Sequence, residues 1–93
     1  MIRQVIASPA FKRCLKAWIK SDPQTKQPIA DAMELLSLDA FCPALHSHKL
    51  HGKMKGAWSC SVGYDLRIIF EIQKLDGIEV IVLVDLGTHD DVY

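Results

Sequence analysis

Apolar and polar side chains alternate along three stretches in the C-terminal half of this 93-residue chain: residues 57–62, 66–72 and 79–86. A period of two is typical of β-strands that bury one face. Turn signals separate the stretches, Gly63-Tyr64-Asp65 and Asp76-Gly77, and an Asp-Gly pair favours a tight hairpin. The pattern therefore predicts a three-stranded antiparallel meander. We expect the third strand to alternate without interruption, with one face made of Val80, Val82, Val84 and Leu86.

The N-terminal half has the spacing of helices instead. Five apolar residues form one stripe at positions i, i+3, i+4, i+7 and i+8: Phe11, Cys14, Leu15, Trp18 and Ile19. Ser8 is expected to cap this helix, with Pro9 at its first position. A second helix is predicted from Thr25, as N-cap, to Leu38. Pro28 then falls in its first turn, where a missing N–H costs nothing.

These elements predict an α+β fold in a single domain, residues 1–93. Residues 2–7 add a short N-terminal strand, and Ser21-Asp22-Pro23 separates the two helices, which should form a hairpin. We expect the hairpin to pack on one face of the sheet. The second helix turns four apolar residues toward it: Ile29, Ala32, Met33 and Leu36.

Composition narrows the class of protein. With 49% hydrophobic and 24% charged residues, the chain is globular rather than disordered. No apolar run approaches the roughly 18 residues of a membrane span, and the N-terminus lacks a secretion signal. The cysteines Cys14, Cys42 and Cys60 have no zinc-type spacing and fit as small core residues in a reducing compartment. We therefore expect a cytoplasmic protein.

The net charge is zero, but basic residues concentrate in residues 1–55, with nine Lys and Arg against four Asp and Glu. Residues 46–55 hold three histidines and three lysines and no acid. Lys49, Lys53 and Lys55 are candidates to neutralise the backbone phosphates of a polyanion. A histidine, whose ordinary pKa is about 6.5, can transfer protons near neutral pH. The alternatives are a solvated basic loop and a metal site, but the spacing matches no structural zinc pattern, so we predict no metal or other cofactor.

Two further residues are candidates for chemistry. Arg67 lies in the middle strand, on the face opposite Leu66 and Ile68, where it offers a fixed fork for a phosphate. The alternative for Arg67 is a cross-strand ion pair with one of three acids: Glu71, Glu79 or Asp85. His89 follows Gly87-Thr88 at the end of the last strand. A histidine in that position is ordinarily a surface residue, and it becomes functional only if the other candidates lie nearby.

Three motifs together resemble the RelE/ParE toxin superfamily, and most closely its YafQ-like mRNA interferase branch. They are His48-x-Leu50-x-Gly52-x-x-Lys55-Gly56, Tyr64-Asp65-Leu66-Arg67-Ile68-Ile69-Phe70 and Gly87-Thr88-His89-Asp90-Asp91-Val92-Tyr93. The resemblance covers residues 46–93 in motif detail and residues 1–45 in the order of their elements. The Gly-Thr-His ending is the most specific of the three motifs.

The resemblance implies a toxin of a type II toxin-antitoxin system. Such a toxin is a ribosome-dependent endoribonuclease that cleaves mRNA without a metal and is held inactive by a cognate antitoxin in a hetero-oligomeric complex. The resemblance implies catalytic roles for His48, Asp65, Arg67, His89 and Tyr93. His48 and His89 would transfer protons and Arg67 would contact the phosphate, while Asp65 would orient a histidine and Tyr93 would stack on a base.

The chain also departs from the YafQ-like pattern. Ser61 stands where such toxins have a second histidine, Asp85 where they have an arginine, and Leu66 where they have a tryptophan. Two alternative functions follow. One is a non-enzymatic ParE-like toxin that binds DNA gyrase, against which the histidines argue. The other is a degenerate member that only binds antitoxin, which Ser61 and Asp85 favour.

Overall fold

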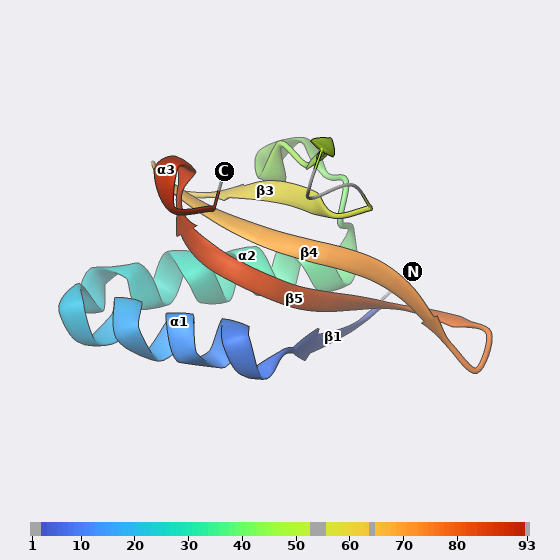
Figure 1. Cartoon of the computed structure of the whole chain (residues 1–93), viewed down its shortest axis with the longest axis horizontal. Helices are drawn as coiled ribbons and strands as arrows, with labels where there is room; N and C mark the ends of the chain where they lie inside the picture. Colours follow the sequence, from blue (N-terminus) through green and yellow to red (C-terminus); the bar gives the residue numbers. More distant parts are fainter. Residues whose placement is uncertain (1–2, 53–55, 64, 93) are drawn as a thin grey trace.

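The computed structural model describes residues 3–52, 56–63 and 65–92. Its elements, in chain order, are β1 (Gln4–Ala7), α1 (Pro9–Ser21), the 3-10 turn η1 (Pro23–Thr25), α2 (Lys26–Leu38), the 3-10 turn η2 (Pro43–Leu45), β2 (His48–Lys49), β3 (Trp58–Val62), β4 (Leu66–Leu75), β5 (Ile78–Thr88) and α3 (His89–Val92). The strands form one five-stranded sheet in the order β1-β5-β4-β3-β2. Helices α1 and α2 lie on one face of it, and α3 lies on the other (Figure 1).

The sheet confirms the predicted meander and the predicted N-terminal strand, and it adds a second edge strand, β2. β3, β4 and β5 pair antiparallel, joined between β4 and β5 by the Asp76-Gly77 turn, in which both residues have positive φ. β1 pairs parallel to β5, and β2 pairs antiparallel to β3. The sequence pattern did not predict β2, because two residues are too few to show a period. The α+β architecture, with the helices packed on the sheet, is as predicted.

Local signals explain where the helices begin. The Ser8 hydroxyl accepts a hydrogen bond from the Phe11 amide, and Pro9 occupies the first position of α1, as predicted. Thr25 occupies the N-cap position of α2, as predicted, but its side chain makes no capping hydrogen bond. The 3-10 turn η1 runs directly into α2, and the Thr25 hydroxyl donates to the carbonyl of Asp22 instead.

The main core lies between the helices and the sheet. It contains Phe11 of α1, Ile29 and Leu36 of α2, and Ile68 and Phe70 of β4, all essentially inaccessible to solvent. The three free cysteines belong to this core, as expected: Cys60 is fully buried, and Cys14 and Cys42 pack partly against it.

A β-bulge in β5 overturns the prediction of uninterrupted alternation. Ile69 of β4 is paired with Asp85 and the next residue, Phe70, with Leu83, so Val84 is the extra residue. Leu83 and Leu86 therefore both reach the helix-side core, and Val84 packs on the opposite face. The bulge turns the Asp85 carboxylate toward α1, where it accepts hydrogen bonds from the Cys14 thiol at 3.5 Å and the Leu86 amide at 2.8 Å.

A second, smaller core covers the sheet face opposite the helices. Leu50, from the residues after β2, meets Ala57, Ile69 and Val92 there, and Ile69 has no solvent exposure. The amide of Leu50 donates to the carbonyl of Ala57 at 2.9 Å, which links the residue after β2 to the residue before β3. Leu50 and α3 thus cover part of this sheet face.

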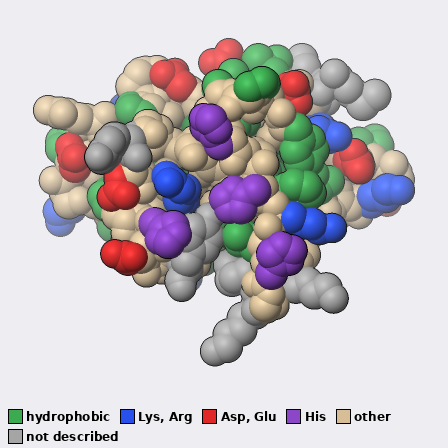
Figure 2. Space-filling model, turned by 90° about the horizontal axis from the view of Figure 1, so that it is seen from above, with side chains coloured by type: hydrophobic (Ala, Val, Ile, Leu, Met, Phe, Trp, Pro, Cys, Tyr) green, Lys and Arg blue, Asp and Glu red, His purple; other side chains and the backbone are tan. Residues whose placement is uncertain are grey.

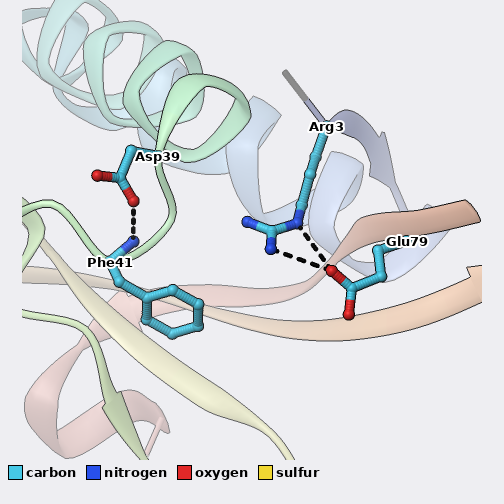
Figure 3. Close-up of polar contacts among 4 residues, drawn as sticks. All are labelled: Arg3, Asp39, Phe41 and Glu79. Atoms are coloured by element: carbon cyan, nitrogen blue, oxygen red, sulfur yellow. Dashed lines mark hydrogen bonds and ion pairs between the residues drawn. The ribbon is translucent and has the colours of Figure 1, made fainter. Parts of the chain in front are cut away.

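Two polar contacts hold the chain just before β1 and just after α2 (Figure 3). Arg3 donates to the Glu79 carboxylate at 3.0 Å and so ties the start of β1 to β5. The Asp39 carboxylate accepts from the Phe41 amide at 3.1 Å and shapes the turn after α2. In the part of the chain that is described, no helix is long and apolar enough to cross a membrane.

Candidate functional site

The Gly-Thr-His ending forms a capping box that places His89. The Thr88 hydroxyl accepts from the Asp91 amide at 3.3 Å, and the Asp91 carboxylate accepts from the Thr88 amide at 3.1 Å. This reciprocal pair starts α3 immediately after β5 and sets His89 at the first position of the helix. Val92, one turn later, is buried in the second core, so the last turn is fixed to the sheet.

Gly87 makes room for this turn. An ideal β-carbon built on Gly87 would lie 2.7 Å from the β-carbon of Asp91 and 3.3 Å from a methyl of Val92. Real β-carbons do not approach that closely, so any side chain at residue 87 would displace α3. Glycine is therefore required here by space rather than by its backbone angles.

His48 is held on β2 at the edge of the sheet. Its residue pairs with Ser59 of β3, and the Ser47 hydroxyl next to it donates to the Ala40 carbonyl at 2.6 Å. Nδ1 of His48 lies 3.3 Å from the carbonyl oxygen of His46. A carbonyl oxygen only accepts, so Nδ1 is the donor in this contact.

Arg67 lies in the middle of the sheet, beside both other motifs. In register it is flanked by Ser61 of β3 and Gly87 of β5. Its guanidinium donates one hydrogen bond within the described residues, to the neighbouring Leu66 carbonyl at 3.0 Å. The acids considered as its partners accept hydrogen bonds from other residues: Glu71 from Gln73, Glu79 from Arg3, and Asp85 from Cys14 and Leu86. Among the described residues, Arg67 forms no ion pair with any of these three acids.

The fold brings His48, Arg67 and His89 to the same face of the sheet. His48 is in the row of Ser59 and Ile69, and Arg67 is in the adjacent row, about 7 Å along the strands. α3 folds back over Gly87, beside Arg67, and its Val92 meets Leu50 from the His48 side above Ile69. The second core thus joins the two histidine-bearing segments, and Figure 2 shows histidine side chains gathered on this face.

Asp65 lies at one end of this arrangement. It immediately precedes Leu66, which pairs with Thr88, so Asp65 and His89 are both just beyond the last paired residues of their strands. Asp65 is exposed and, together with Thr88 and Trp18, lines a cavity of about 320 Å³ at the end of the sheet. It lies near the His89 side of the face rather than beside His48.

The structure does not bring Lys49 together with the other candidates. Lys49 pairs with Trp58 and its ammonium lies 5.9 Å from the centre of that ring, whereas Trp58 itself packs on the helix-side core. Successive residues of a strand point to opposite faces, so Lys49 points away from the face of His48. The remaining candidates, Lys53, Lys55 and Tyr93, lie outside the described residues.

Charged contacts at the site are weak ones. Nδ1 of His89 is 3.7 Å from the Asp90 carboxylate, but both side chains are largely exposed, and such pairs contribute little. Within the ranges that the structure describes, no three His, Cys, Asp or Glu side chains are grouped as metal ligands.

Burial raises the pKa of the Cys60 thiol to about 12, and burial together with Asp85 raises the pKa of the Cys14 thiol. Both cysteines belong to the helix side and neither faces the site.

Sequence reasoning gave no supporting role to four residues that hold this site together: Ile69, Gly87, Thr88 and Asp91. One signal was present, because Thr88-x-x-Asp91 has the spacing of a capping box, with aspartate in place of the usual glutamate. The second core left no comparable signal, since its members come from four separate segments.

Comparison with known proteins gives the family of this chain and relatives of its fold. The family model described as the bacterial toxin of type II toxin-antitoxin system, YafQ, matches residues 3–93. Among solved structures, YafQ from E. coli strain BL21(DE3) superimposes with a TM-score of 0.78 at 18% identity, covering 98% of each chain. The YoeB/ParE toxin from Agrobacterium tumefaciens gives 0.76 at 15% identity, covering 92% of this chain and 98% of that one. A chain of the E. coli DinJ-YafQ complex gives 0.76 at 22% identity, covering 98% of each.

No curated protein matches the chain in sequence. At these identities the solved structures show the fold alone, which is that of the RelE/ParE toxins. The match of the family model over nearly the whole chain is more specific: this chain belongs to the YafQ family of type II toxin-antitoxin toxins.

Proposed function

We propose that this toxin is a ribosome-dependent endoribonuclease that cleaves mRNA through attack by a ribose 2′-OH on the adjacent phosphate. The observation that carries the proposal is the convergence of His48, Arg67 and His89 on one sheet face, joined by the second core around Ile69. A ParE-like binder has no use for two histidines arranged around an arginine.

The reaction needs three things that these side chains supply. A base takes the proton of the 2′-OH as the O2′–P bond forms, and positive charge stabilises the phosphorane. An acid then protonates the 5′ oxygen as the P–O5′ bond breaks, which leaves a 2′,3′-cyclic phosphate and a 5′-hydroxyl. One of His48 and His89 acts as the base and the other as the acid, and Arg67 binds the phosphate oxygens. In its neutral form His48 would act through Nε2, because Nδ1 lies against the His46 carbonyl.

The remaining candidates support binding and orientation. Asp65, near the His89 end, is proposed to orient that histidine. Tyr93 is proposed to stack on a base, and Lys49, Lys53 and Lys55 to neutralise backbone phosphates. No metal enters this mechanism, since proton transfer and the arginine carry the charge.

The position of Asp85 bears on whether activity survives the departures from the family pattern. Its carboxylate faces Cys14 and α1, so the negative charge lies behind the sheet rather than beside the proposed phosphate site. Ser61 is different, because it flanks Arg67 in register on the catalytic face. That position favours a second candidate function, a toxin that retains antitoxin binding but has lost cleavage.

The proposed partner is a cognate antitoxin. A structural relative, YafQ of E. coli, has been solved in a complex with DinJ. For this chain we propose an acidic antitoxin segment that folds on binding and docks against α1, which carries no acid and presents Lys12, Arg13 and Lys16 around a hollow of about 370 Å³ floored by Leu15 and Ile19. A ribosome-dependent enzyme of this kind acts in the cytoplasm.

Induction of the protein in bacteria, with and without its antitoxin, tests the proposal. Within minutes of induction, translated mRNAs should be cut within their coding regions, and co-expressed antitoxin should prevent it. His89→Ala should bind antitoxin equally but leave mRNA intact. Growth arrest with intact mRNA would reject the nuclease, and absence of both toxicity and antitoxin binding would reject the toxin.

A further inference from the structure

An exposed aromatic cluster lies at the β2 edge of the sheet. Phe41 and Trp58 meet at a centroid distance of 4.8 Å with their rings 67° apart, and the Lys49 ammonium lies 5.9 Å from the centre of the Trp58 ring. Phe41 is 45% exposed. We refer to Phe41, Trp58 and Lys49 as the edge cluster.

The cluster is held in place by contacts on every side. The Asp39 carboxylate fixes the backbone of Phe41 (Figure 3), and the Ser47 hydroxyl bonds the carbonyl of the residue before it, Ala40. Lys49 pairs in register with Trp58. Phe41 is therefore tied to the same short segment that carries His48, and its ring is presented to solvent without having to reorganise.

Phe41 packs against Trp58 and still leaves much of its ring exposed to solvent. The other large apolar side chains exposed in the described ranges are Leu38, Leu75 and Ile78, none of which is aromatic. The sequence that follows Phe41 is basic, since residues 42–64 hold three histidines and three lysines and no Asp or Glu. The carboxylate next to Phe41, that of Asp39, is engaged by the Phe41 amide. A π surface beside a basic stretch has the chemistry of a single-strand nucleic-acid contact.

We infer that the edge cluster is a nucleobase-stacking subsite for single-stranded RNA, with Phe41 as the stacking platform. The inference rests on the proposed function and extends it, by assigning the base beside the cleaved phosphate to the β2 edge. His48 and Lys49 point to opposite faces of β2, so an RNA strand with its phosphate at His48 crosses this edge to reach Phe41. Stacking tolerates any base, so the subsite contributes affinity rather than sequence choice.

The other class of occupant is an antitoxin segment, for which an exposed phenylalanine would also serve. RNA is favoured because of the Lys49 ammonium over Trp58, the basic stretch after Phe41 and the chain connection to His48. Experiments can distinguish the two occupants. RNA stacking requires the π face of the ring, whereas an antitoxin contact requires only its apolar area.

Binding of a fluorescein-labelled, single-stranded RNA to the purified full-length toxin, followed by anisotropy, tests the subsite. Phe41→Leu keeps apolar volume but removes the π face and should weaken binding by about tenfold, whereas Phe41→Trp should bind at least as tightly as the unaltered toxin. Leu38→Ala is the matched control, because Leu38 is equally exposed, at 47%, and should have no effect. Thermal melts of each variant establish that it is folded.

Salt dependence distinguishes the roles within the cluster. Lys49→Met should reduce the slope of log affinity against log salt by about one, while Phe41→Leu should lower affinity without altering the slope. Unchanged RNA affinity in Phe41→Leu overturns the inference, and so does a loss confined to antitoxin binding. If the unaltered toxin binds RNA through Phe41 but never cleaves it, the subsite stands and the proposed nuclease fails.

Discussion

Gly87 lies directly beneath Asp91, so closely that a β-carbon on Gly87 would come within 2.7 Å of the β-carbon of Asp91. We predict that Gly87→Ala displaces α3 and lowers the free energy of unfolding by about 1–3 kcal/mol, as overpacking does elsewhere. Cleavage should fall much further, because His89 moves with α3. Urea denaturation and a cleavage assay measure the two effects. Asp90→Ala, in the same turn but fully exposed, should alter neither, and a fully active Gly87→Ala protein would contradict the role given to α3.

Arg67 should matter for cleavage and hardly for stability. Its guanidinium makes one hydrogen bond in the described structure, to a neighbouring carbonyl. Arg67→Ala should therefore abolish mRNA cleavage and change the free energy of unfolding by less than about 1 kcal/mol. Arg3→Ala is the control, since Arg3 pairs with Glu79 on the far edge of the sheet and its loss should leave cleavage intact. A stable and fully toxic Arg67→Ala protein would remove Arg67 from the site.

The basic side of α1 should govern antitoxin binding without affecting catalysis. Charge reversal of Lys12, Arg13 and Lys16 together should weaken the complex at least about tenfold, because an acidic segment loses its complementary charge. Titration calorimetry measures the affinity, and RNA cleavage by the free toxin should be unchanged. Reversal of Lys74, at the distant β4–β5 hairpin, serves as the control. Undiminished affinity in the α1 variant would place the antitoxin elsewhere.

The buried Cys60 thiol predicts a loss of stability in alkali. Its pKa is raised from an ordinary value of 9.0 to about 12 by burial in the helix-side core. Below pH 9 the thiol is protonated in both states. Above it the unfolded chain loses the proton and the folded one keeps it, so stability falls as pH rises toward 12.

Urea denaturation from about pH 8 to about pH 10 should show this decline as a difference between two proteins. The unaltered protein should lose up to about 1 kcal/mol per pH unit more than Cys60→Ala above pH 9. Parallel curves would mean that the thiol is more accessible to water than its position indicates.

The helical hairpin and the meander were predictable because each has its own repeat. Phe11 to Ile19 follow a helical period, and Leu66 to Ile72 a strand period, over enough residues to be read from the sequence. The bulge at Val84 was not predictable, since nothing local in a run of alternating residues marks the position where one is inserted. β2 likewise exists only because His48 and Lys49 find partners on β3.

The candidate residues of the site could be named from the sequence, but the contacts that bring them to one sheet face could not. Motif resemblance named His48, Arg67 and His89, whereas their spacing in sequence did not bring them together. What joins them is long-range packing of Leu50 and Val92 on Ile69, residues that look like ordinary apolar positions. The resemblance also counted Asp85 as evidence against catalytic activity. The bulge in β5 weakens that argument, because it turns the carboxylate toward Cys14.

Cleavage-site mapping by primer extension in a purified translation reaction tests the central claim most directly. The unaltered toxin should cut a translated mRNA at discrete sites and leave ends with 2′,3′-cyclic phosphates. His48→Ala and His89→Ala should each reduce the rate by at least about 100-fold, while His51→Ala, from the same basic segment, should cut normally. Intact mRNA with the unaltered toxin, or undiminished cleavage by either His48→Ala or His89→Ala, would contradict the assignment of this sheet face as a nuclease site.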